Sequence, residues 1–248
     1  MMRVVAALGM AVLLSACASW IKDEGGSRQK LSKTYAEKGA AYLAEGNLEI
    51  AASDLRKSLK LDPNNAAAHG TIALLYERLR MLDKAAEHYR RAAALKPDDS
   101  GIIGNYGRFL CHQGRHQEGL KLLRQAAADK LYAKRWIPLT NAGDCAYAAG
   151  KLEEAERYLR QALELNPENA LALELLVRLM LAKQEYLKAR AFLQRYETIA
   201  KPTPEMLEAG YQIESALGDL QAAEAYRNRL NALPPPESSE KPKPSPTE

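Results

Sequence analysis

The sequence predicts an all-α solenoid of six helix-turn-helix repeats, which form a right-handed superhelix with a concave groove. The first observation is a period: Pro63 and Pro97 stand 34 residues apart, and Pro167 follows 70 residues later, two periods plus two residues. The second is an alternation of small and bulky residues at fixed places in each period, as closely packed helices require. The third is the recurrence of helix-capping residues at the same places.

A 34-residue period with this pattern is typical of tetratricopeptide repeats, each of which is a pair of antiparallel helices. With the proline at repeat position 32, the repeats fill residues 32–233, and Lys134 and Arg135 are inserted before the fourth. The repeats are expected to begin at Ser32, Ala66, Ser100, Trp136, Ala170 and Pro204. Stacking of such repeats buries a continuous core.

The first repeat shows the alternation of small and bulky residues most plainly. Its positions 4, 8, 11, 20, 24, 27 and 32 hold Tyr35, Gly39, Tyr42, Ala51, Leu55, Ser58 and Pro63. The third repeat is weaker, because Gly119 stands where an alanine is expected and Leu131 where the proline is expected.

Helix ends recur in the same register. Position 34 carries a residue that can cap the next helix, namely Asn65, Asp99 and Asn169, and Thr203 followed by Pro204 can do the same. Position 15, where a left-handed residue is expected to end the first helix of a pair, holds Gly46, Gly114, Gly150 and Gly218.

The start of the chain resembles an export signal that ends in a lipid-attachment site. One arginine precedes an apolar run that is too short to span a bilayer. Residues 14–17 (Leu-Ser-Ala-Cys) resemble the lipobox of bacterial lipoproteins. We therefore expect residues 1–16 to be a signal peptide, Cys17 to carry acyl chains that hold the protein on a membrane, and residues 17–31 to form a flexible tether. A buried or free cysteine after a poor signal sequence is the alternative.

The residues after this cysteine bear on the choice of membrane. Ala18 and Ser19 follow Cys17, whereas lipoproteins retained in the inner membrane often carry aspartate directly after the cysteine. The resemblance therefore implies a lipid anchor on the periplasmic face of the outer membrane.

The C-terminal tail differs in composition from the repeats. Residues 234–248 hold six prolines in fifteen residues and no apolar run. Such a segment cannot bury a core, so we expect it to be extended and disordered.

Charge and motifs exclude several classes of function. The chain has 248 residues, 35 of them basic and 31 acidic, and its net charge of +4 is too small to imply a nucleic-acid partner. His112 and His116 have the spacing of a helical metal pair beside Cys111, but Gly114 and the expected turn lie between them. Phosphate loops, nucleophile elbows and zinc-protease motifs are absent from the sequence. We expect no enzymatic activity, no metal, no cofactor and no small-molecule substrate.

The expected binding site is the concave face, which the first helix of each pair lines. This face is expected to be apolar in the first two repeats and more polar farther along. The residues expected to line it are Ala36, Ala40, Leu43, Leu74, Arg78, Arg108, Asp144, Tyr147 and Arg178. An ordinary solvated face is the alternative for any one of them. Ala36 and Ala40 occupy positions where chaperone-binding repeats carry the lysine and asparagine of a carboxylate clamp, so that device is absent.

Two cysteines remain besides Cys17, an even number in an oxidising compartment. Cys111 occupies position 12 of the third repeat and Cys145 position 10 of the fourth, on first helices that lie side by side in a solenoid. A disulfide between them would close a loop of about 34 residues. Two buried thiols are the alternative.

The third and fourth repeats also carry a more specific motif. Residues 105–114 (NYGRFLCHQG), 131–132 (LY) and 141–145 (NAGDC) resemble the PilW/PilF family of type IV pilus biogenesis and stability lipoproteins. The resemblance spans nearly the whole chain and supports the disulfide, since both motif cysteines are kept. It implies a pilotin-like scaffold that helps the pilus secretin to reach the outer membrane and form multimers, or that supports pilus stability, with other pilus assembly proteins as further partners.

Another periplasmic repeat lipoprotein is the alternative interpretation. Such a protein would act as an adaptor for outer-membrane barrel assembly or for cell-wall enzymes. An enzyme of the cell wall is a weaker third hypothesis. Loss of secretin multimers would favour the pilotin, whereas a general loss of barrel proteins would favour the adaptor.

Overall fold

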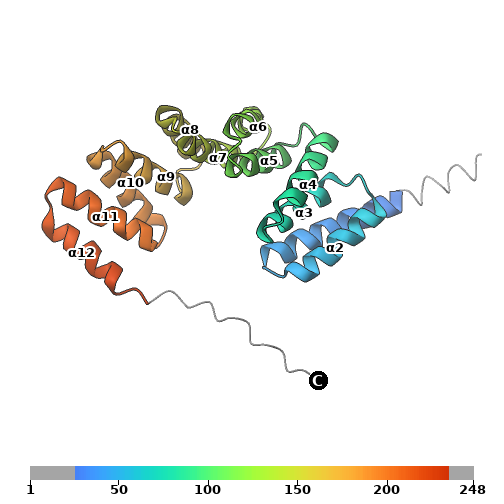
Figure 1. Ribbon diagram of the computed structural model, residues 1–248, viewed down its shortest axis with the longest axis horizontal. Helices are drawn as coiled ribbons and strands as arrows, with labels where there is room; N and C mark the ends of the chain where they lie inside the picture. The colour runs from blue at the N-terminus through green and yellow to red at the C-terminus, as the bar shows by residue number, and fades with distance from the viewer. Residues whose placement is uncertain (1–25, 235–248) are drawn as a thin grey trace, which may run out of the picture. The chain divides into compact units, whose positions relative to one another are not determined.

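The computed structural model describes residues 26–234, and every regular element in that part of the chain is an α-helix (Figure 1). The first helix covers residues 26–44. It is followed by α2 (Leu48–Leu61), α3 (Ala66–Arg78), α4 (Leu82–Leu95), α5 (Ser100–His112), α6 (His116–Ala128), α7 (Trp136–Ala148), α8 (Leu152–Leu165), α9 (Ala170–Ala182), α10 (Tyr186–Ile199), α11 (Pro204–Leu217) and α12 (Leu220–Asn231). The predicted all-α fold is confirmed.

Successive helices pack in pairs, as helix-turn-helix repeats require. The pairs α3 with α4, α5 with α6, α9 with α10, and α11 with α12 pack along their lengths. First helices of neighbouring repeats also touch, α3 with α5 and α9 with α11. The helices α3, α5, α7, α9 and α11 begin at the residues where the proline period places the repeat starts.

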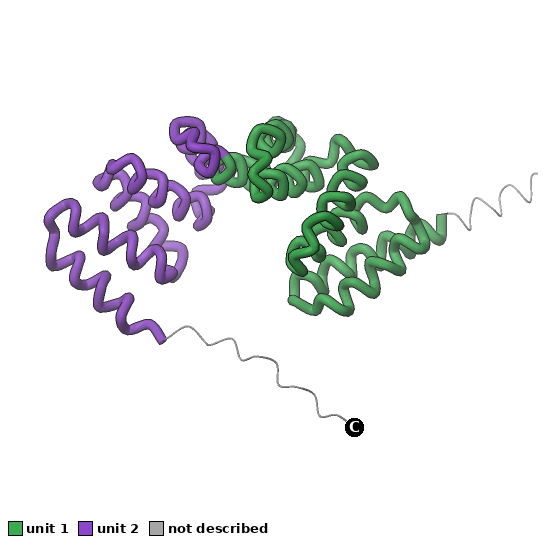
Figure 2. Tube along the Cα trace, in the orientation of Figure 1, with its two compact units in different colours: residues 1–145 green, residues 146–248 purple. Residues whose placement is uncertain are grey.

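The chain divides into two compact units, of residues 1–145 and 146–248, with the boundary inside α7 (Figure 2). In the first unit, the buried ring of Tyr89 lies 5.0 Å from that of Phe109 and 5.9 Å from that of Tyr106, measured between centroids. In the second unit, α9 is apolar on almost every side, and a helix of that kind is stable only when it is buried. Its buried side chains are Ala172, Leu173, Leu175, Leu176, Val177, Leu179 and Met180.

The predicted helix caps are confirmed. The side-chain oxygens of Asn65, Asp99, Asn169 and Thr203 each accept a hydrogen bond from the backbone N–H three residues later. Each bond satisfies one of the N–H groups that the first turn of a helix leaves without an intrahelical partner. Pro204, which has no N–H, begins α11 at the position where this lack costs nothing.

The predicted left-handed turns between paired helices are also present, and they extend to repeats that lack glycine. Gly46, Gly114, Gly150 and Gly218 have φ values between 72° and 84°. Arg80 and Gln184 occupy the same position of the second and fifth repeats, and both have φ 58°. Because a Cβ atom makes this conformation cost about 1 kcal/mol, the packing of the two helices, rather than the residue at the turn, determines the geometry.

The expected tether differs from the structure over its last part. Residues 26–31 belong to the first helix, so the helix begins at least six residues before Ser32. Arg28, Gln29, Lys30 and Leu31 are all good helix formers, and they extend a helix that the first repeat already nucleates. The expected signal peptide, Cys17 and the tail after Pro234 lie outside the described residues. None of the described helices combines the length and apolar character that crossing a membrane requires.

Candidate partner-binding site

Two residues expected to line the groove lie in the core instead. Leu43 is only 4 % exposed and packs with Ala51 and Leu75, whereas Ala36 is 3 % exposed and packs in the cluster that contains Leu55. The physical reason is that the first helix of repeat one faces both α2 and α3, so positions 5 and 12 are covered by the second repeat. The expectation that these two side chains meet a partner is therefore wrong.

The other expected residues of the first two repeats remain at the surface to different degrees. Ala40 is exposed, and Leu74 is partly buried against the core clusters on either side of it. The exposed Arg78 donates a hydrogen bond to the backbone carbonyl of Leu43, near the C-terminal end of the first helix. A cation is favoured there by the helix dipole. Arg78 therefore links the first two repeats and still presents part of its side chain to a partner.

The most developed polar cluster of the first unit surrounds Glu77, near the end of α3. Arg108 on α5 forms a two-pronged ion pair with it, with Nη1 2.9 Å from Oε1 and Nη2 2.9 Å from Oε2. The hydroxyl of the buried Tyr89 donates to the same Oε2 at 2.9 Å. This fork fixes both the distance and the orientation of α3 relative to α5. Arg108 was expected in the groove, but its pairing with Glu77 was not.

These neighbours keep the Glu77 carboxyl ionised. Burial by itself raises the pKa of Glu77, but the imidazole of His112, the guanidinium of Arg108 and the hydroxyl of Tyr89 outweigh this effect and lower the pKa to about 2. Burial and the Glu77 charge in turn raise the pKa of Tyr89. The carboxylate is fully engaged by donors, and a carboxyl with so low a pKa is a poor proton acceptor near neutral pH.

We expect Glu77→Gln to lower the free energy of unfolding by about 1–2 kcal/mol near neutral pH, an amount reduced by the partial solvent exposure of the site. Because the folded-state pKa is depressed, the stabilisation by Glu77 is present above pH 4.5 and is lost as the pH falls towards 2. The difference in unfolding free energy between wild type and variant, measured by urea unfolding followed by circular dichroism at a series of pH values, should therefore be largest at neutral pH and shrink below pH 4.5. Glu164→Gln, at an exposed carboxylate of α8, is the matched control and should follow the wild type. If the unfolding free energy of Glu77→Gln changed with pH between 4.5 and 2 as steeply as that of the wild type, Glu77 would not have the depressed pKa.

His112 and Asp144 extend this cluster towards the fourth repeat. The Nδ1 atom of His112 lies 3.2 Å from Arg108 Nη1, and its Nε2 atom lies 4.0 Å from Asp144 Oδ2. The same Nδ1 atom lies 3.7 Å from Glu77 Oε1, so the imidazole contacts both members of the ion pair. The first unit thus places a row of polar groups with alternating charge on the first helices of repeats two to four.

A cysteine adjoins each of these two residues, Cys111 before His112 and Cys145 after Asp144, and the structure joins the two in a disulfide with Cα atoms 5.5 Å apart. The bond connects α5 to α7 and holds His112 and Asp144 on neighbouring helices. Both cysteines are buried. Within residues 26–234 no three histidine, cysteine, aspartate or glutamate side chains come together in a metal-ligating group.

Close packing around Cys111 explains one of the two departures of the third repeat, Gly119. A Cβ atom built on Gly119, where an alanine is expected, would lie 2.3 Å from Cys111 Sγ and 2.7 Å from the carbonyl oxygen of Gly107. Even a methyl group is therefore excluded from this position. Glycine at this position therefore lets the Cys111 sulfur and the backbone of α5 approach α6 closely.

The second unit has a separate hollow on its first helices. Arg178 and Leu181 of α9 and the start of α11 enclose a cavity of about 390 Å³. The residues from α11 are Pro204, Glu205, Met206, Glu208, Ala209 and Gln212. The Arg178 guanidinium lies 5.9 Å from the ring centroid of Tyr147, within the range of a cation–π contact. Leu181 and the other apolar side chains line the hollow, and Glu205 and Glu208 give it an acidic edge.

The family comparisons agree with this architecture. Two models described as tetratricopeptide repeat match the chain, one at residues 37–100 and 140–204 and the other at residues 100–168. The type IV pilus assembly protein PilF of Pseudomonas aeruginosa is 31 % identical over 214 residues, which are 86 % of this chain and 84 % of PilF. The chain belongs to the PilF/PilW family of tetratricopeptide-repeat proteins.

Solved structures of this family have the same fold. A structure of PilF from Pseudomonas aeruginosa matches with a TM-score of 0.76 and 28 % identity, over 83 % of this chain and 92 % of that one. A crystal structure of PilW, described as a widely conserved type IV pilus biogenesis factor, matches with a TM-score of 0.77 and 30 % identity, over 82 % and 93 % of the two chains. The resemblance first seen in residues 105–145 is confirmed as membership of the PilF/PilW family.

Proposed function

We propose that this PilF/PilW-family protein is a lipid-anchored, non-catalytic scaffold of the outer membrane that promotes localisation and multimerisation of the pilus secretin and supports pilus stability. One observation carries the proposal: the similarity to PilF extends over 84 % of PilF and 86 % of this chain, rather than over one or two repeats. A generic repeat protein would match through its repeat pattern alone.

The exposed polar side chains suit a binding role better than a catalytic one. Glu77 is held ionised by its donors, so it does not serve as an acid or base near neutral pH. In the second unit, apolar walls lie between the Arg178 guanidinium and the carboxylates of Glu205 and Glu208. They favour a partner segment with an apolar side chain flanked by an acidic group, which would meet Arg178, and a basic group, which would meet the two glutamates. Ala40, Leu74, Arg78, Arg108 and Asp144 are the proposed contacts of the first unit. Tyr147 and Arg178 are those of the second.

The lipid supplies location rather than specificity. Several acyl chains on Cys17 would keep the repeats at the membrane, since each buried methylene contributes about 0.8 kcal/mol. The scaffold would then hold a secretin segment stoichiometrically until the subunits oligomerise, and no turnover is required.

The test is a deletion strain examined by semi-native immunoblot for heat-resistant secretin multimers. Complementation uses the wild type, Cys17→Ala, Arg178→Glu and Arg124→Glu. Arg178 lies at the hollow of the second unit, and Arg124 is an exposed residue on a second helix, α6. We expect multimers to be lost in the deletion strain and with Arg178→Glu, mislocalised with Cys17→Ala, and unchanged with Arg124→Glu.

Other outcomes separate the alternatives. If the deletion strain kept its secretin multimers but had less pilin on the surface, the proposed role in secretin multimerisation would be refuted. The protein would then support pilus stability alone. A parallel loss of many outer-membrane barrel proteins would indicate a general adaptor instead.

A further inference from the structure

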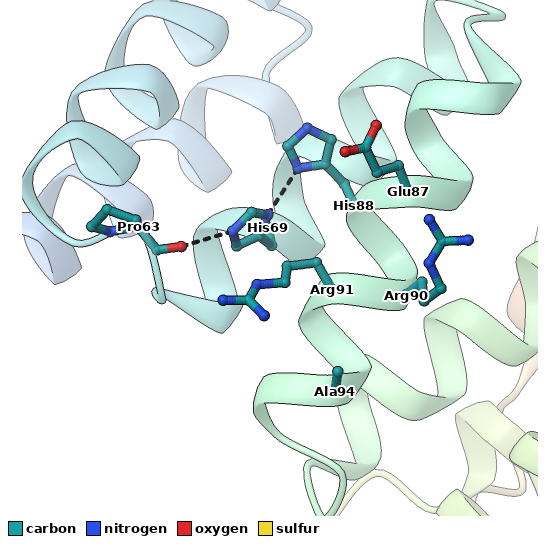
Figure 3. Close-up of a pocket in the computed structure, with 7 residues that line it drawn as sticks. All are labelled: Pro63, His69, Glu87, His88, Arg90, Arg91 and Ala94. Atoms are coloured by element: carbon teal, nitrogen blue, oxygen red, sulfur yellow. Dashed lines mark hydrogen bonds between the residues drawn. The ribbon is translucent and has the colours of Figure 1, made fainter.

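A second cavity lies away from the candidate binding face, beside the second helix of repeat two. It has a volume of about 510 Å³ and is formed by α4, α3 and the turn before α3. Its lining residues are Pro63, His69, Glu87, His88, Arg90, Arg91 and Ala94 (Figure 3). Four of these seven side chains are histidine or arginine, and one is acidic. The proposed scaffold function uses none of them.

The two histidines form a hydrogen-bonded pair whose proton positions follow from chemistry. His69 lies between Pro63 and His88, with Nε2 3.0 Å from the Pro63 carbonyl oxygen and Nδ1 2.9 Å from His88 Nδ1 (Figure 3). A carbonyl can only accept, so His69 Nε2 carries a proton and the Nδ1 of neutral His69 does not. His88 Nδ1 must then donate to His69, which leaves His88 Nε2 as the bare nitrogen of the pair.

The hydrogen-bonded pair of His69 and His88 can bind one additional proton without losing the bond between the two rings, but not two. A proton added at His88 Nε2 leaves the bond between the two Nδ1 atoms intact. A second proton, on His69 Nδ1, would place two N–H groups face to face at 2.9 Å and break the contact. The pair therefore becomes a single cation in which His88 has an N–H group to offer.

The arginines add charge that the protein does not neutralise. Arg91 donates from Nη2 to the amide oxygen of Asn64 at 2.6 Å, a neutral partner. Arg90 has no hydrogen bond or ion pair in the described part of the chain, and Glu87 has no ion pair there. With neutral histidines the lining has a net charge of +1, and with the pair protonated it has +2.

We propose that this cavity binds a phosphate group, belonging either to a lipid headgroup or to a free phosphate compound. The planar guanidinium groups suit phosphate oxygens, and a protonated His88 adds a further donor. A divalent metal ion, the other common ligand of a histidine pair, is disfavoured because two arginines share the lining with only one carboxylate.

Binding should depend on pH. Burial and the neighbouring His69 lower the pKa of His88, and the Glu87 carboxylate opposes this effect. The other ring packed on His88 is Tyr76 of α3, 5.5 Å away between centroids, and Lys84 lies over the face of that tyrosine. An anion in the cavity favours protonated His88, so binding takes up a proton and strengthens as the pH falls.

The test is isothermal titration calorimetry on the full chain carrying Cys17→Ala, with inorganic phosphate and with glycerophosphoglycerol, at pH 5.5 and 7.5. The pH comparison uses glycerophosphoglycerol, a phosphodiester whose own charge is constant over this range. We expect affinity to fall about tenfold at the higher pH and about tenfold or more in the double variant Arg90→Gln, Arg91→Gln. Glu87→Gln should strengthen binding, and Arg124→Gln, at an exposed arginine of α6, should leave it unchanged.

Vesicle flotation distinguishes the sources of the phosphate. A lipid headgroup would be identified if the protein is retained on vesicles that contain phosphatidylglycerol but not on phosphatidylcholine alone. The double variant should then lose this retention. Binding of the soluble probes without retention on either vesicle would identify a free phosphate compound. Absence of binding to both soluble probes at both pH values, or equal binding by the double variant, would overturn the proposal.

Discussion

Loss of the disulfide between Cys111 and Cys145 is expected to lower the free energy of unfolding by roughly 3–4 kcal/mol. The bond spans a sequence separation of 34 residues, and in the chain-entropy model a loop of this length restricts the unfolded chain by about that amount. The effect is large because a single domain is stable by only about 5–15 kcal/mol. Urea unfolding followed by circular dichroism, with and without reductant, measures it.

The control for this prediction is the double variant Cys111→Ala, Cys145→Ala. Its free energy of unfolding should equal that of the reduced wild type, apart from a small loss because the two sulfur atoms no longer pack in the core. Reductant should not change its unfolding transition. Because both cysteines are buried, the disulfide must be reduced in denaturing urea and the protein refolded before the transition is measured. An unchanged transition midpoint after complete reduction, checked by mass spectrometry, would show that the bond does not stabilise the fold.

The features that sequence predicted well depend on local interactions or on register. Asn65 and Asp99 cap helices through N–H groups only three residues away, so the neighbouring sequence already contains both partners. The cysteine pair could be inferred as a candidate because the repeat register places both residues on adjacent first helices. The alternative of free thiols stayed open, since a register does not give the distance between two sulfur atoms.

The features that sequence missed depend on side chains from distant parts of the chain. Glu77 and Arg108 are 31 residues apart, and their two-pronged bond requires a particular placement of both side chains. The histidine pair of the second cavity likewise brings together α3 and α4 through one atom of each ring. Arg80 adopts the left-handed conformation that glycine adopts in other repeats, because the packing of the two helices imposes this turn on it. A repeat pattern predicts which face a residue occupies, but not which neighbour covers it.

The first repeat offers the sharpest test of this difference, because Ala40 and Leu43 lie on one helix and both were expected in the groove. Leu43→Asp is expected to lower the free energy of unfolding by about 4 kcal/mol or more, since the carboxylate would enter the contact with Ala51 and Leu75 without a partner. Ala40→Asp should lower stability by only about 1 kcal/mol or less, the cost of placing an aspartate in an exposed helix position. Thermal and urea unfolding of the two variants provide the measurement.

The variants Leu43→Asp and Ala40→Asp also show how a loss of secretin multimers should be interpreted. Loss with Leu43→Asp would report an unfolded first repeat, whereas loss with Ala40→Asp in a stable protein would report a partner contact. Leu43→Met, which keeps the volume and the apolar character, should preserve both stability and multimers. If Leu43→Asp proved as stable as the wild type, Leu43 would have to be accessible to solvent, and the apolar groove of the first repeat would regain its place as a binding surface.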